Sequence, residues 1–135
     1  MDRPVGVWVV FLGYIAYAAL GLGVLGYVFT HFDTLSPRLQ AQYGDMETVD
    51  LLVEAGLHLV PVVGGVALVM LMRAACYIFA LNLALLIGLA VLTVVAEIAT
   101  DTFTGTGYAG TIIGIGIAQA THNYAWKLSK DGTLN

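Results

Sequence analysis

The chain has 135 residues, of which 59% are hydrophobic and only 10% are charged, and its formal net charge at pH 7 is −4. Soluble domains average roughly 45–50% apolar and about 25% charged residues, so this composition excludes an ordinary soluble domain and predicts a membrane protein. The acidic balance offers no basic surface for nucleic acid, and we expect the lipid bilayer to be the main partner. The length suits a single transmembrane domain over residues 1–135.

Four apolar segments are long enough to cross a bilayer, whose hydrocarbon core needs about 20 helical residues. They predict transmembrane helices over residues 6–30, 50–72, 74–98 and 107–127. Short connections join the second, third and fourth segments, which is typical of neighbouring helices that run in opposite directions. The expected fold class is therefore all-α: an integral membrane four-helix bundle with antiparallel up-down topology.

Small residues recur at steps of three and four in the first and fourth segments, and we call these two rows the small-residue stripes. In the first segment the members are Ala16, Ala19, Gly23 and Gly26. In the fourth they are Gly107, Gly110, Gly114, Ala118 and Thr121. In lipid, helices attract one another largely through close backbone contact at small residues. We therefore expect the first and fourth helices to pack through these stripes, within the bundle or across a homo-oligomer.

The long connection is the outer loop over residues 31–49, between the first and second segments. Ser36 followed by Pro37 is typical of a helix start, with a capping residue and then proline at the first helical position. The sequence therefore predicts a short helix over "SPRLQAQY", lying on the membrane surface and ending at Gly44.

The second segment carries polar residues on one helical face. Asp50, Glu54, His58, Pro61 and Gly65 follow one another at steps of four, four, three and four. If the helix is centred near Pro61, Glu54 lies roughly 10 Å and His58 roughly 5 Å from the bilayer midplane. Ionisable side chains at that depth are costly, so we expect this face to look into the bundle.

The third segment supplies a counterpart at its outer end. Glu97 and Asp101 lie one turn apart, and an antiparallel hairpin would bring them beside the outer half of the second helix. The sequence predicts one cavity open to the outside, with Asp50, Glu97 and Asp101 at its mouth, Glu54 within it and His58 at the bottom.

Other polar residues in the third and fourth segments have a simpler interpretation. We expect Asn82 to form a hydrogen bond with a neighbouring helix, and we expect the same of the group Gln119, His122 and Asn123. Amide and imidazole side chains commonly join membrane helices in this way.

The basic residues predict the orientation in the membrane. Four of the five lie on one side of the predicted spans: Arg3, Arg73, Lys127 and Lys130. Cytoplasmic loops carry an excess of Lys and Arg, so we expect both termini in the cytoplasm and a multi-pass location in the plasma or inner cell membrane.

Three functions fit the predicted cavity. The first is handling of a small solute, an ion or protons, with Glu54 exchanging a proton and His58 relaying it. The second is a metal-dependent membrane enzyme, in which Glu54, His58 and Glu97 bind a divalent metal. The third is a non-catalytic subunit of a larger membrane complex. In a fourth, purely structural interpretation, a hydrogen bond between Glu54 and His58 only stabilises the second helix.

Overall fold

The computed structural model describes residues 3–44, 46, 48–100 and 108–135. The described chain is helical and contains no strand, as predicted. Its elements are α1 (Val5–Thr30), the 3-10 helix η1 (Phe32–Thr34), α2 (Pro37–Gly44), α3 (Thr48–Val69), α4 (Ala74–Ala99) and α5 (Tyr108–Lys130).

Three of the helices are long and apolar enough to cross a membrane, namely α1, α3 and α4. Helix α5 has 23 residues but does not reach the same hydropathy, because its second half is rich in polar side chains. These side chains are Gln119, His122, Asn123, Lys127 and Lys130. Length and composition therefore support three of the four predicted spans in the described chain.

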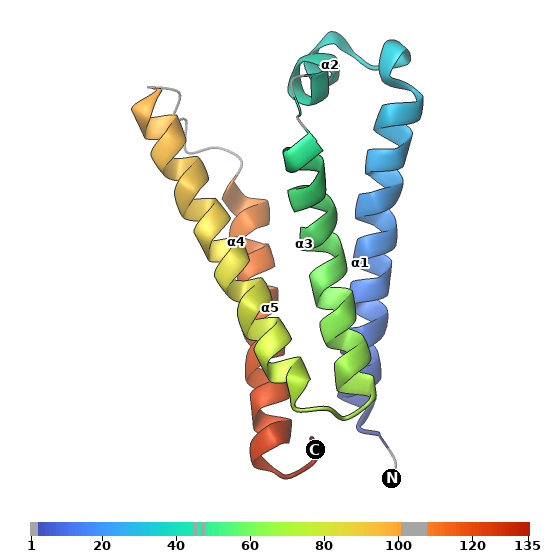
Figure 1. Ribbon diagram of the computed structural model, residues 1–135, viewed down its shortest axis with the longest axis vertical. Helices are drawn as coiled ribbons and strands as arrows, with labels where there is room; N and C mark the ends of the chain where they lie inside the picture. Colours follow the sequence, from blue (N-terminus) through green and yellow to red (C-terminus); the bar gives the residue numbers. More distant parts are fainter. Residues whose placement is uncertain (1–2, 45, 47, 101–107) are drawn as a thin grey trace.

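The long helices form two pairs that converge at one end. Figure 1 shows α1 and α3 side by side along most of their length, while α4 packs on α5. The pairs meet where α1 begins and α5 ends, which we call the terminal end, and they diverge toward the end that carries α2, which we call the α2 end. The molecule is therefore closed at one end and splayed at the other.

The buried core lies in the terminal half of the molecule. Its members come from all four long helices and from the last residues of the chain: Val7, Tyr14, Ala67, Leu68, Leu71, Ala75, Cys76, Phe79, Ala125, Leu128 and Leu134. Many large apolar side chains elsewhere are exposed, including Leu20, Leu52, Leu92 and Ile112. An apolar surface of this kind is costly in water and favourable in lipid.

Phe79 of α4 joins the helices at the centre of this core. A Cβ atom built on Gly64 of α3 would lie 2.7 Å from the Phe79 ring, so only glycine leaves room there. The Tyr14 ring of α1 stacks on Phe79, with 5.7 Å between ring centroids. The Tyr14 hydroxyl donates a hydrogen bond of 3.2 Å to the Thr121 hydroxyl of α5. We call these four residues, one from each long helix, the Phe79 cluster.

The last residues of the chain close the terminal end. Leu134 is only 1% exposed and belongs to the core. The backbone N–H of Asn135 donates to the Leu71 carbonyl, and the backbone N–H of Arg73 donates to the Asn135 carbonyl, both at 2.8 Å. Leu71 has a positive φ of 56°, which ends the predicted second helix before residue 72. The tail thus supports the tight connection between α3 and α4.

The predicted packing of the two small-residue stripes against each other is wrong within this chain. Ala16 and Ala19 are exposed, and a Cβ on any described glycine of either stripe meets nothing within 4 Å. Only Ala118 and Thr121, near the terminal end, are buried. Toward the α2 end, the two helix pairs to which α1 and α5 belong diverge (Figure 1). Gly107 lies outside the described residues.

Replacing Gly64 with alanine should destabilise the protein, because the new methyl group would overlap the fully buried Phe79 ring. Overpacking of this kind typically costs about 1–3 kcal/mol, and thermal unfolding in detergent should show a lower midpoint. Gly56→Ala is the matched control on the same helix, since a Cβ there meets nothing within 4 Å. That variant should be neutral or stabilised by up to about 1 kcal/mol. Equal midpoints for the two variants would contradict the close contact.

Candidate functional site

Glu54 and His58 face each other one helical turn apart on α3. His58 Nε2 lies 3.5 Å from Glu54 Oε1. His58 is only 7% exposed, whereas the Glu54 side chain is 44% exposed. His58 Nδ1 is buried and has no hydrogen-bond partner among the residues that the structure describes. The pair therefore combines an accessible carboxylate with a buried imidazole that retains one unused nitrogen.

Helix α1 holds the imidazole in place. A Cβ atom on Gly21 would lie 2.2 Å from His58 Cε1, so the ring occupies the space that a side chain at this position would need. The Tyr17 ring lies on the same side, with 4.7 Å between the Tyr17 and His58 ring centroids. The sequence did not reveal this role of Gly21, because the partner of a glycine cannot be deduced from its spacing.

A cavity of about 300 Å³ adjoins the Glu54–His58 pair, and we call it the acidic cavity. It is formed by α1, α3 and one residue of α2. Its lining consists of Tyr17, Leu20, Gly21, Val24, Leu25, Tyr43, Glu54 and His58. A carboxylate, an imidazole and two tyrosines thus share a wall that is otherwise apolar.

The structure does not bring Glu97 to this cavity. The Tyr108 hydroxyl of α5 donates a hydrogen bond to Glu97 Oε2, which places Glu97 between α4 and α5 at the α2 end. Asp50 is exposed at the start of α3, and Asp101 lies outside the described residues. The predicted grouping of Glu97 with Glu54 and His58 assumed that α3 and α4 stay together along their length. They diverge instead (Figure 1).

The described residues form no group of three or more His, Cys, Asp or Glu side chains that could hold a metal ion. The three predicted metal ligands are divided, with Glu54 and His58 on one pair of helices and Glu97 on the other. Protein zinc sites use three or four protein ligands. Two donors at the acidic cavity fall short of that number.

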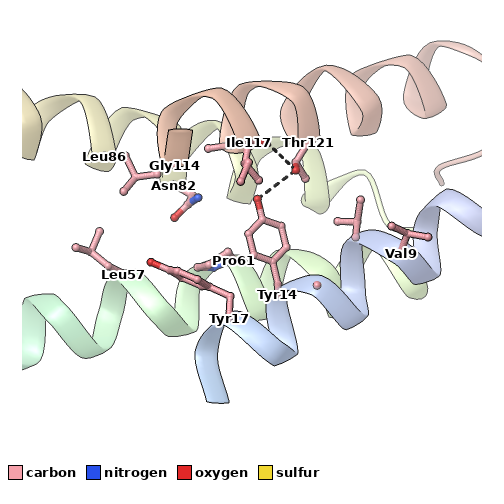
Figure 2. Close-up of a pocket in the computed structure, with 13 residues that line it drawn as sticks. Val9, Tyr14, Tyr17, Leu57, Pro61, Asn82, Leu86, Gly114, Ile117 and Thr121 are labelled. Atoms are coloured by element: carbon pink, nitrogen blue, oxygen red, sulfur yellow. Dashed lines mark hydrogen bonds between the residues drawn. The ribbon is translucent and has the colours of Figure 1, made fainter. Parts of the chain in front are cut away.

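A second cavity, of about 370 Å³, lies where all four long helices meet, and we call it the central cavity (Figure 2). Its lining consists of Val9, Val10, Gly13, Tyr14, Tyr17, Leu57, Pro61, Asn82, Leu86, Gly114, Ile117, Ala118 and Thr121. Tyr17 lines both cavities. The sequence reasoning missed the central cavity, and its only signal was a polar Asn82 within an apolar segment.

The polar side chains around the central cavity differ in their hydrogen bonding. Tyr14 donates to Thr121, which itself donates to the Ile117 carbonyl at 2.9 Å. Asn82 is 3% exposed, and its Oδ1 atom is buried without a hydrogen-bond partner in the described part of the chain. The expected interhelical bond to this oxygen is therefore absent. Leaving a buried acceptor unpaired costs about 1–3 kcal/mol.

A comparison of the chain with protein-family models, with curated proteins and with solved structures finds no match.

Replacing Gly21 with alanine should displace the His58 ring and break its contact with Glu54, because the new methyl group would occupy the same space. The imidazole NMR signals of His58, assigned with a His58→Gln variant and followed over a pH series in detergent, should differ from those of the wild type. Gly23→Ala is the control on the same helix, since its Cβ meets nothing within 4 Å. Unchanged His58 signals in Gly21→Ala would mean that the ring is not held as described.

Proposed function

We propose that the protein is a multi-pass integral membrane protein that exchanges protons for a small organic cation at the Glu54–His58 pair. The observation that supports this proposal is the placement of a carboxylate and a buried imidazole 3.5 Å apart, beside a cavity, in a helix apolar enough to span a membrane. An ionisable residue within a spanning helix is by default a candidate for ion or proton handling.

The membrane part of the proposal includes α5 as a fourth span. Its first half is apolar, and its polar half ends near the terminal end, where headgroups would contact it. Two cation–π contacts lie toward the terminal end. Arg3 lies 6.0 Å from the Trp8 ring centroid, and Lys130 lies 5.8 Å from the Trp126 ring centroid. Tryptophan and basic side chains favour the membrane interface, and the basic excess supports a cytoplasmic terminal end.

This orientation can be tested with single cysteines in a Cys76→Ala background. A cysteine at Thr34, in η1 at the α2 end, should react with a membrane-impermeant maleimide on intact cells. A cysteine at the exposed Asp131, just after α5, should react only after the cells are permeabilised. The reverse pattern would overturn the orientation, and labelling of both from outside would overturn the arrangement with both termini inside.

The chemistry of the exchange follows from the cost of charge inside a membrane. Glu54 is stabilised either by taking up a proton or by binding a cation, so the two compete for one carboxylate. His58 places Nε2 beside Glu54, while its buried Nδ1 lacks a partner. An imidazole can take up a proton at one ring nitrogen and release a proton from the other. The pair can therefore load and release a proton as the solute binds.

The lining of the acidic cavity indicates the class of solute. Two aromatic rings, Tyr17 and Tyr43, share the wall with the Glu54 carboxylate. Aromatic faces and a carboxylate together attract a cation with apolar substituents, because the ring supplies negative electrostatic potential and the aliphatic wall accepts the substituents. A weakly hydrated organic cation fits this lining better than a small inorganic ion.

Binding of tetraethylammonium should release protons from the purified protein, because the cation displaces a proton from Glu54; the release is measured in weakly buffered detergent between about pH 5 and 8. Glu54→Gln should abolish the release, because the amide has no proton to exchange. Asp131→Asn is the control, since Asp131 is exposed and lies beyond α5. Proton release that persists in Glu54→Gln, or its absence from the wild type over this range, would contradict the exchange.

A further inference from the structure

We infer that the central cavity is a binding site for a small neutral alcohol or phenol, whose apolar body fills the cavity and whose hydroxyl donates a hydrogen bond to Asn82 Oδ1. This site lies outside the Glu54–His58 pair and does not depend on the exchange proposed there.

The size and lining of the central cavity match those of small-molecule sites. Its volume of about 370 Å³ falls within the range of roughly 300–1,000 Å³ that such sites span. Most of the lining is aliphatic, and four polar side chains are placed among it, namely Tyr14, Tyr17, Asn82 and Thr121. An apolar pocket with a few converging polar groups binds a molecule by its shape and orients it by its polar atoms.

Asn82 Oδ1 is a buried hydrogen-bond acceptor that a ligand could satisfy. Figure 2 shows the Asn82 side chain reaching from α4 into the space near Leu57 and Tyr17, away from the Tyr14–Thr121 hydrogen bond. The residue is 3% exposed, and this oxygen has no partner among the described residues. A buried amide oxygen in a membrane helix can be satisfied only by a donor, and an alcohol or phenol supplies one together with an apolar body.

The other polar groups favour a hydroxyl over an amine. The Tyr14 hydroxyl already donates to Thr121, whose own proton is directed to the Ile117 carbonyl, so these two side chains form a satisfied part of the wall. The Tyr17 hydroxyl lies on the opposite side of the space that Asn82 enters (Figure 2). A ligand hydroxyl donates and accepts, so it suits the Asn82 oxygen and the Tyr17 hydroxyl at once. A cationic amine would carry a charge into a cavity that holds no acid.

The test uses two probes with the same apolar body, 4-propylphenol and propylbenzene. Binding to the full chain in detergent is measured by equilibrium dialysis against the same detergent without protein, which removes the contribution of the micelles. Asn82→Leu should weaken binding of 4-propylphenol about tenfold, the value of one hydrogen bond, and leave propylbenzene unchanged. The variant should fold, because leucine replaces an unpaired polar group of similar size; retained propylbenzene binding would show this directly.

A matched pair of glycine variants locates the bound probe. Gly114 lines the central cavity and a Cβ there meets nothing within 4 Å, so Gly114→Leu should occupy part of the cavity and weaken binding of both probes. Gly116 lies on the same helix, outside the lining, and has equally open surroundings, so Gly116→Leu should bind both as the wild type does. Glu54→Gln should also retain phenol binding, which separates this site from the exchange at the acidic cavity.

Three results would overturn the inference. The first is failure of 4-propylphenol to bind the wild type above the detergent background. The second is an equal affinity of 4-propylphenol for the wild type and Asn82→Leu, which would indicate that water alone satisfies the amide. The third is undiminished binding of either probe to Gly114→Leu.

Discussion

The contact between the Phe79 ring and Gly64 is the interaction on which the rest of the structure depends. It holds α3 and α4 together at one level, and the Tyr14 ring stacks on the same phenylalanine, which fixes α1. Through its hydroxyl, Tyr14 also reaches Thr121 of α5. The central cavity is lined by Tyr14 and Thr121 themselves, so the cluster that closes the bundle also forms one wall of the cavity. Where its contacts end, the two helix pairs are free to separate.

A membrane would make this uneven packing tolerable. In water, the apolar side chains exposed along the diverging helices would favour closure of the whole bundle. In lipid that driving force is missing, because hydrocarbon chains solvate an apolar side chain as well as another helix does. Attraction then depends on close fits such as Phe79 on Gly64 and His58 on Gly21. Between these fits the helices can enclose cavities at little cost, provided that the polar atoms inside find partners.

Composition and the length of the apolar segments predicted the all-α class and the three most apolar helices, and helical spacing predicted the common face of Glu54 and His58. Each of these depends only on the sequence within one helix. The partner of Glu97 could not be predicted in this way. Residue spacing gives the height of Glu97 along α4, but its direction depends on how α4 rotates and tilts against Tyr108 of α5. The same limit applies to Asn82, whose oxygen was expected to meet a neighbouring helix and faces a cavity instead. The small-residue stripes were misjudged because a row of glycines permits close approach without requiring it.

Tyr17 is a wall residue that the acidic cavity and the central cavity share. Its side chain lines both, and its ring lies against His58. A rotation of this one ring would therefore change the walls of both cavities at once. Two occupants that prefer different positions of the ring would compete across the wall without touching, and thermodynamic linkage requires each to weaken the other by the same factor. Through the Tyr17 side chain, a cation bound beside Glu54 would thus affect the filling of an apolar space about two helical turns away along α1 and α3.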